Sequence, residues 1–468
     1  MLKATFGISD KMPDPADIQS AGQWYFLNHI SSSLIQFDYD NNSFTPLLAK
    51  NWKIDGDQYI FELRPDAKFS DGSEITSIDL KYSFMRIILL KTSSHFAPWE
   101  YIKGADSVKS LSDEFPGIKI IDNKTVSFTL TSKRSSFMLQ MASPEGGIWH
   151  HEDIDPVTLK LRPSIRRYSG PYFISNELPS KKIHLSINTF SPLFKENPDM
   201  PDSIDLLALS RKNAEDMMIS KELDVFIGDY IPYNKYDWNQ LGFGVHLTTP
   251  SSILYFYRLK SGTDPIVDSK LIEAIWGNRK EKGLVPAETF LPFGSMGAIN
   301  KTDYIESMPT EIKIRTKTVK VAAPNIYFTE EFLNEIIESS KLVGVNLIID
   351  RLPMSEYLDL PKKENSGYDF MLSTYVASER YPAVQFRYIL EEHIPKFSKE
   401  LEEIDNPEMY FKQKEIFADF QKKLIKTQTI LPLFFVRTNI VYQNNIDIGG
   451  QPRTDAELRL WKIRGLKF

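Results

Sequence analysis

Histidines and carboxylates gather at one place in the chain, His150 to Asp153, with Asp155 close behind. These residue types can bind a metal ion or carry protons in acid–base catalysis. Adjacent histidines, however, point to opposite faces of a strand and diverge by about 100° around a helix. Chelating pairs usually stand at i, i+2 or i, i+4 instead. We therefore expect a solvated loop here, and we predict no metal site and no bound cofactor.

The motifs of the common catalytic classes are missing from the sequence. There is no G-x-S-x-G, no H-E-x-x-H and no glycine-rich phosphate loop. There is also no cysteine, which excludes a cysteine nucleophile, disulfide bonds and zinc held by thiolates. We expect no catalytic residue. A hydrolase site assembled from the 7 scattered histidines and the many carboxylates is the less favoured alternative.

The composition is that of a globular protein with more than one domain. At about 150 residues per domain, a chain of 468 residues has room for two or three. The net charge is −6 and the basic residues are scattered, which argues against nucleic acid as a partner. The apolar run 430–436 ends at Arg437 and is too short to cross a bilayer. The 21 Tyr, 30 Phe and 7 Trp fill a large core or line a ligand cleft.

The stretch 44–90 predicts a β-hairpin followed by a helix. Apolar and polar residues alternate over 59–64, the period of a strand with one buried face. Asp55-Gly56 supplies the turn from the preceding strand, and Ser77 is expected to cap the helix. The predicted buried stripe of that helix consists of Ile78, Tyr82, Met85 and Leu89.

Two later stretches indicate how the second half of the chain folds. A strand at 317–322, a helix at 329–342 and a strand at 345–349 form a β-α-β unit, in which Gly344 ends the helix. Residues 430–435 are apolar on both faces of a strand, which predicts an internal position in a sheet. A strand so close to the C-terminus must join a sheet begun earlier, so we expect a lobe built from separate segments.

The order of residues within 44–90 is more specific than its periodicity. It resembles the signature of the family 5 extracellular solute-binding proteins, the peptide, dipeptide and nickel receptors of bacterial ABC importers. Another family motif, in which the chain leaves the small domain, is similar to Tyr168-Ser169-Gly170-Pro171-Tyr172. The matching segments of the signature are Pro46-Leu47-Leu48-Ala49, Trp52, Tyr59-x-Phe61-x-Leu63-Arg64, Lys68-Phe69-Ser70-Asp71-Gly72 and Thr76-x-x-Asp79-Leu80-x-Tyr82-Ser83.

The resemblance implies an α/β protein with a two-lobed, periplasmic-binding-protein-like fold. This fold is of type II with an extra small domain, has mixed sheets and holds its ligand in a cleft between the lobes. We expect a discontinuous large lobe made of 1–40, 168–260 and 430–468. The small additional domain is expected to comprise 41–167, and the second lobe 261–429.

The resemblance also implies where a ligand binds. In relatives, the segment leading into the first helix borders the cleft, and here it holds Gln23, Trp24 and Tyr25. The alternative is that Trp24 belongs to the core and Gln23 to the surface. A loop of the small domain lies over the ligand in relatives, and the similar loop here carries Phe96 and Trp99.

The second lobe is expected to contribute the run from Tyr375-Val376 to Arg380. Peptide-binding relatives typically have an aspartate there that holds the peptide α-ammonium, and Ser378 takes its position. A hydroxyl cannot neutralise a buried ammonium. Arg258 stands where such relatives often carry an acid. We therefore predict a ligand with an anionic or acylated end; in the alternative, the alignment slips at Arg258 and both residues are structural.

The implied function is that of the substrate-binding protein of an ABC importer. Such a protein captures a peptide or peptide-like small solute between its lobes and delivers it to a membrane permease. We expect a monomer without a membrane span, located in the periplasm or on the extracytoplasmic cell surface. Because Met1–Ala4 leads directly into a strand, no signal peptide is present as written, and we expect it to have been removed. A solute sensor with the same fold is the alternative.

Overall fold

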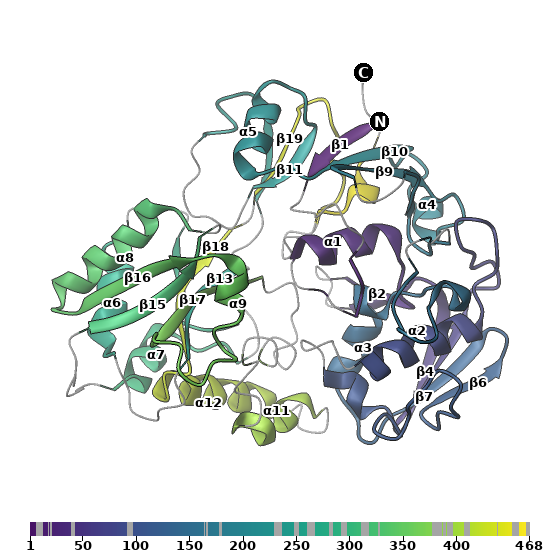
Figure 1. The fold of residues 1–468 in the computed structure, drawn as a ribbon, viewed down its shortest axis with the longest axis horizontal. Helices are drawn as coiled ribbons and strands as arrows, with labels where there is room; N and C mark the ends of the chain where they lie inside the picture. The colour runs from purple at the N-terminus through teal and green to yellow at the C-terminus, as the bar shows by residue number, and fades with distance from the viewer. Residues whose placement is uncertain are drawn as a thin grey trace.

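A computed structural model gives the architecture, which is drawn in Figure 1. The chain forms two bodies with separate sheets, here called the large lobe and the second lobe, and a small domain beside the large lobe. The structure describes residues 1–5, 13–16, 18, 21–38, 43–90, 97–162, 164, 167–176, 180–228, 236–247, 252–259, 267–279, 284–291, 297–309, 318–325, 328–376, 386, 390, 396–406, 412–437, 439–451 and 458–464.

The large lobe is built on a seven-stranded mixed sheet. Its strands lie in the order β12 (Gly244–Leu247), β19 (Asn439–Tyr442), β11 (Val225–Gly228), β1 (Leu2–Thr5), β10 (Ser203–Leu207), β9 (Lys182–Ile187) and β8 (Tyr172–Ile174). β1 runs parallel to β10 and β11, and the other neighbours are antiparallel. Its helices are α1 (Ala21–Ile30), α4 (Pro192–Glu196) and α5 (Arg211–Ile219).

The second lobe is built on a six-stranded mixed sheet. Its strands lie in the order β14 (Val285–Pro286), β18 (Ile430–Val436), β13 (Ser252–Arg258), β17 (Phe370–Val376), β15 (Thr318–Pro324) and β16 (Asn346–Leu352). Its helices include α6 (Ser269–Gly277), α7 (Lys301–Ser307), α8 (Glu330–Leu342), α9 (Met354–Leu358), α11 (Ser398–Asp405) and α12 (Gln413–Lys426).

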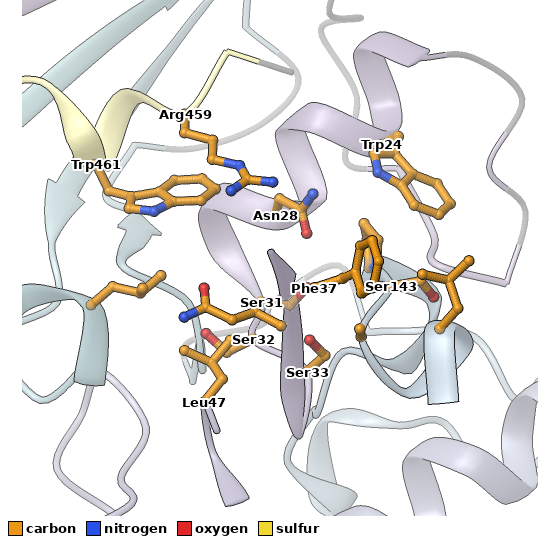
Figure 2. Close-up of a pocket in the computed structure, with 15 residues that line it drawn as sticks. Trp24, Asn28, Ser31, Ser32, Ser33, Phe37, Leu47, Ser143, Arg459 and Trp461 are labelled. Atoms are coloured by element: carbon orange, nitrogen blue, oxygen red, sulfur yellow. The ribbon is translucent and has the colours of Figure 1, made fainter. Parts of the chain in front are cut away.

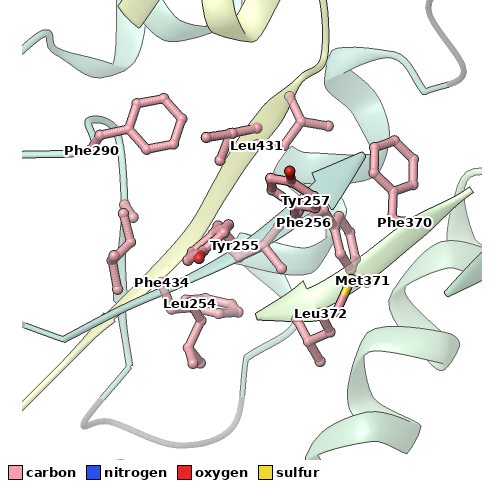
Figure 3. Packing of buried hydrophobic residues seen from close by; sticks show 14 of the residues in the cluster. Leu254, Tyr255, Phe256, Tyr257, Phe290, Phe370, Met371, Leu372, Leu431 and Phe434 are labelled. Carbon is pink, nitrogen blue, oxygen red and sulfur yellow. The ribbon is translucent and has the colours of Figure 1, made fainter. Parts of the chain in front are cut away.

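The predictions for the second lobe agree with its packing. β15, α8 and β16 form the predicted parallel β-α-β unit, and Gly344 follows the helix at a φ of +74°. β13 and β18 are buried at every position, and β18 lies between β13 and β14. This confirms that 430–435 is an internal strand. Figure 3 shows the aromatic core around these strands, where the rings of Phe256 and Phe370 pack with centroids 5.6 Å apart.

The small domain is a four-stranded antiparallel sheet packed against helices. The strands lie in the order β4 (Ala49–Asp55), β5 (Gln58–Leu63), β7 (Thr125–Thr129) and β6 (Ile118–Asp122), next to a separate hairpin of β2 (Ile35–Asp38) and β3 (Ser43–Pro46). The helices are α2 (Ser77–Leu90) and α3 (Ser136–Met141). The ring of Phe84 on α2 meets Phe128 at 4.9 Å, and Phe137 on α3 meets Tyr59 at 4.7 Å.

The hairpin and helix predicted for 44–90 are confirmed, but two details of the helix differ. Thr76 rather than Ser77 stands at the N-cap position of α2, and Asp79 of the first turn reaches back to accept from its N–H and hydroxyl at 2.8 and 2.9 Å. The Ser77 hydroxyl instead donates to a carbonyl of β6. The buried face is also rotated from the predicted stripe, because Ile78 is 43% exposed. The buried apolar residues of α2 are Leu80, Phe84, Met85, Ile87 and Ile88.

The chain crosses between the two lobes twice. It passes from the large lobe to the second lobe between β12 and β13, and it returns between β18 and β19. The boundaries expected at 260 and 430 are therefore displaced, since β13 and β18 belong to the sheet of the second lobe. Burial on both faces marks a strand as internal but does not say which sheet it joins. The other expected domain boundaries stay a prediction.

The Arg86–Asp14 pair tests how the N-terminal segment is held to the small domain. The Arg86 guanidinium on α2 is fully buried and donates to both oxygens of Asp14 at 2.7 Å. Because Asp14→Asn leaves a buried cation without its counter-charge, we expect a loss of about 3 kcal/mol in the free energy of unfolding. Asp66→Asn removes the exposed pair with Lys195 and should cost less than about 1 kcal/mol. Equal losses in denaturant titrations would contradict the assignment.

Candidate functional site

Three strand ends meet where the second lobe receives the two crossings. Ser252, the first residue of β13, pairs with Val376 of β17 and with Val436 of β18. Val436 and Ser252 are also the residues at which β18 leaves and β13 enters the lobe. Tyr375 and Val376, which were predicted to bind the ligand, therefore lie at the end of the sheet nearest the large lobe (Figure 1).

Arg258 lies at the opposite end of β13. Six steps of about 3.3 Å separate it from Ser252, on the order of 20 Å. Its Nη1 atom donates to the Thr427 carbonyl at 3.0 Å, and its side chain is buried. Thr427 directly follows α12, where a cation meets the negative end of the helix dipole. These contacts favour a structural role, the alternative that the sequence left open.

A pocket opens beside α1, between the large lobe and the small domain. Its empty volume is about 600 Å³, including open solvent. In Figure 2 the side chains of Trp24, Asn28, Arg459 and Trp461 surround a common space. The pocket thus combines indole rings, an amide, hydroxyls and one guanidinium, a set that suits a solute with apolar, polar and anionic parts. The other lining residues are Ser31, Ser32, Ser33, Gln36, Phe37, Leu47, Leu139, Ala142, Ser143, Pro144 and Leu193.

His29 fastens α1 to the segment that carries Arg459 and Trp461. Its buried ring contacts the Tyr25 carbonyl through Nδ1 at 2.6 Å, and its Nε2 accepts from the Leu460 N–H at 3.1 Å. Because a carbonyl only accepts and an N–H only donates, the proton of this ring is on Nδ1. The edge of the ring also meets Trp461, with centroids 4.8 Å apart. Two walls of the pocket are therefore joined by one neutral imidazole.

Gly170 explains the second family motif in physical terms. An added Cβ at this position would lie 2.4 Å from the carbonyl carbon of Ile30 and 2.5 Å from the Ser31 nitrogen. The connection to β8 can therefore approach the end of α1 only through a glycine. Next to it, the hydroxyl of Ser169 accepts a hydrogen bond from the Ser32 N–H at 3.0 Å. These contacts fix Ser31, Ser32 and Ser33 in the pocket wall.

The predicted site residues of the first part of the chain fall in different surroundings. Trp24 is half-buried and lines the pocket, whereas Tyr25 is 3% exposed and belongs to the core. Gln23 is half-buried and is not part of the pocket lining. Trp99 packs in the core of the small domain against Phe84, with centroids 5.1 Å apart. Phe96, Ser378 and Arg380 lie outside the described residues.

Sequence reasoning missed Asn28, Arg459 and Trp461 as pocket residues. Asn28 lies one helical turn after Trp24, so helical spacing from a suspected site residue was an available signal. Arg459 and Trp461 lie beyond the last predicted strand, in the turn η6 (Leu460–Lys462) and directly before it. No local pattern connects that segment with α1, because the contact depends on the tertiary fold.

The histidine pair is arranged differently from the expectation. The rings of His150 and His151 stack with centroids 4.5 Å apart, so the prediction that they diverge is wrong. His150 has an extended backbone (φ −66°, ψ 131°) and precedes the short turn η3 (His151–Asp153), so neither the strand nor the helix rule applies. With Asp79, the pair presents three possible ligand atoms within 4.8 Å of one another.

These atoms already have partners in the protein. His151 Nδ1 lies 2.8 Å from the Asp79 carboxylate, and Arg167 Nη1 lies 3.3 Å from His150 Nε2. The Glu152 N–H donates to His150 Nδ1 at 3.2 Å. A metal ion here would displace these bonds and also face the Arg167 guanidinium. The geometry is that of a structural cluster that joins α2 to the chain leaving the small domain.

Proteins of known structure share this fold over its whole length. Listeria monocytogenes OppA bound to peptide aligns with a TM-score of 0.76 at 16% identity, over 100% of this chain and 99% of that one. NikA from Brucella suis in complex with Fe(III)-EDTA aligns with a TM-score of 0.77 at 13% identity, over 98% and 99%. Two lobes and two crossings thus define the two-lobed fold of the periplasmic-binding-protein type.

The chain belongs to the bacterial extracellular solute-binding proteins, family 5, whose model matches residues 43–276. The periplasmic murein peptide-binding protein MppA of Escherichia coli is 20% identical over 433 residues, or 82% of this chain and 77% of that one. The periplasmic oligopeptide-binding protein OppA of the same organism is 30% identical over 139 residues, spanning 28% of this chain and 25% of that one. The family consists of substrate-binding receptors rather than enzymes. Within the described residues, no helix is long and apolar enough to cross a membrane.

The His150 cluster predicts a stability that falls in acid. Burial lowers the pKa of His150 below its usual 6.5; nearby Asp79 opposes this shift, and Arg167 adds to it. The unfolded chain therefore binds a proton at a higher pH than the folded one, so stability from this group is lost as the pH falls below 6.5. We expect His150→Gln to reduce the fall in melting temperature between about pH 7.5 and 5.5. An identical acid response in the variant would contradict this.

The position of Arg258 separates a structural role from a ligand role. Arg258→Met loses the bond to Thr427 but keeps most of the buried volume. We expect a loss of about 1–3 kcal/mol in the free energy of unfolding with unchanged solute affinity. Denaturant titration and calorimetric titration measure the two effects. Lower affinity at unchanged stability would restore the ligand role predicted from the sequence.

Proposed function

We propose that the protein captures a peptide or peptide-like solute and delivers it to the permease of an ABC importer. The observation that carries this proposal is the pocket between α1 and the segment 459–461, on a fold that matches peptide-binding relatives from end to end. Trp24 and Trp461 offer flat apolar surfaces on which peptide groups or apolar side chains can pack. From the second lobe we propose Tyr375 as a further contact, since it lies at the end of the sheet where the chain crosses to the large lobe.

We propose further that the solute has an anionic or acylated end. Arg459 brings a guanidinium to the pocket, and guanidinium groups bind carboxylates through paired, charge-assisted hydrogen bonds. The replacement of the usual aspartate by Ser378 supports the same ligand chemistry. Arg258, in contrast, no longer supports it, because its guanidinium donates to the Thr427 carbonyl at the end of α12.

The partner and location follow from this role. We propose that the protein acts outside the cytoplasm, as its family name implies, and that a membrane permease is its macromolecular partner. One chain supplies both lobes and the pocket, so a monomer is sufficient for binding. These points rest on the family and on the pocket, and the oligomeric state is testable by light scattering.

A ligand panel tests the proposed function. Peptides with free and with acetylated N-termini are compared by thermal shift and by X-ray scattering, and we expect the acylated or acidic members to raise the melting temperature and compact the protein. Mass spectrometry of solutes that co-purify identifies further candidates. A protein that is neither stabilised nor compacted by any peptide would exclude this function.

Trp24→Ala identifies the pocket as the binding surface. Removing one stacked indole should weaken the best solute about tenfold, or about 1.4 kcal/mol. Trp52→Ala is the control, because Trp52 is half-buried on β4 of the small domain and does not line the pocket. Equal affinities of both variants in calorimetry would place the solute elsewhere.

A further inference from the structure

A buried carboxylate of the second lobe reaches into the small domain. Asp405, the last residue of α11, is 0% exposed. Its Oδ1 accepts from the Ser136 N–H at 2.9 Å, and its Oδ2 accepts from the Ser136 hydroxyl at 2.7 Å. Its carbonyl accepts from the Ser135 N–H at 2.9 Å and from the Ser135 hydroxyl at 3.2 Å. We call these three residues the clasp.

The clasp supplies an N-cap that α3 does not make for itself. Ser135 stands at the cap position of α3 but has helical backbone angles (φ −65°, ψ −34°), and its side chain makes no capping bond within the helix. The first N–H groups of a helix need acceptors, and a negative charge near them is favourable. The carboxylate of Asp405 fills this role from the other lobe.

α3 connects the clasp to the pocket. It is only six residues long, and all of them are buried. Its first residue, Ser136, binds Asp405, while Leu139 and the following Ala142 and Ser143 line the pocket beside Trp24. A change at the first turn of so short a helix is transmitted directly to its last turn, because a helix of this length is marginal without its cap.

The clasp is a polar contact between bodies that share no core. In the described part of the chain, no buried hydrophobic cluster contains residues of both the second lobe and the small domain. Figure 1 shows α3 and α11 on the side of the molecule away from the two crossings. Polar groups exchange protein partners for water when such a contact opens, so its opening costs less free energy than exposing a hydrophobic core would.

We propose that Asp405 is a positioning residue for solute binding, which closes the second lobe onto the small domain and orders the pocket wall by capping α3. The inference rests on the proposed function for its solute, but the state of α3 can be measured without one. If the solute prefers the closed form, a less stable clasp lowers the fraction of closed molecules. The apparent affinity for the solute then falls in proportion to that fraction.

Asp405→Ala tests the clasp. We expect faster hydrogen exchange of the backbone amides of 136–141 without solute, a larger radius of gyration in scattering, and about tenfold weaker binding of the best solute from the panel. Glu403→Gln is the matched control on the same helix, since the Glu403 side chain is exposed and pairs with the exposed Lys399, and it should behave as the wild type.

Ser136→Ala is the second variant, because it keeps the backbone bond to Asp405 and loses only the hydroxyl. It should move the same readouts in the same direction by a smaller amount, and it carries the test if Asp405→Ala does not fold. Unchanged exchange of 136–141 and an unchanged radius of gyration in the folded variants would overturn the clasp. Absence of binding by every panel solute, with exchange altered as expected, would count against the proposed function and not against the clasp.

Discussion

Each lobe completes its sheet only with strands that the chain delivers through the two crossings. β13 and β18 are adjacent, fully buried strands of the second sheet, and β19 returns to stand between β11 and β12 in the first. Buried backbone groups must keep their partners, so neither crossing can shift without unpairing a ladder. The lobes are therefore tied on one side. Any contact on the other side, such as that of Asp405, is made between surfaces rather than within a shared core.

The pocket depends on close contacts between α1 and two connecting segments, rather than on the sheets. His29 holds the turn at Leu460 against α1 through its Nε2, while its Nδ1 bonds to the Tyr25 carbonyl within α1. Gly170 lets the connection to β8 lie against the end of the same helix. The polar groups of the wall are thus preorganised by neighbours, which reduces the ordering cost of binding. Trp24 and Arg459 face the space that these contacts enclose.

Much of the fold could be predicted from the sequence because it depends on local patterns of apolar residues and glycines. The alternation of 59–64, Gly344 after α8 and the apolar run 430–435 all led to the correct element, and the residue order in 44–90 pointed to the family. The sheet that β13 and β18 join was not predictable, since burial pattern does not name a partner strand. The N-cap of α2 lies one residue earlier than expected, at Thr76, whose N–H and hydroxyl donate to the Asp79 carboxylate.

The site was harder to predict from the sequence, because local patterns do not show which distant segments meet. Trp24 was suggested by its place in the resemblance, but Arg459 and Trp461 reach it only through tertiary packing. Arg258 was predicted to bind the ligand from its place in the sequence. In the structure its guanidinium is buried and donates to the carbonyl of Thr427, directly after α12. The stacked histidines likewise escaped the periodicity rules, because His150 lies in neither a helix nor a strand.

The segment 458–464 lies at the far end of the sequence, yet it forms a wall of the pocket against α1. During synthesis, a ribosome-bound chain that still lacks Trp461 has no complete pocket, however well its earlier segments have folded. A nascent chain cannot form the wall that Arg459 and Trp461 give this pocket until residues 458–464 have emerged and packed against α1.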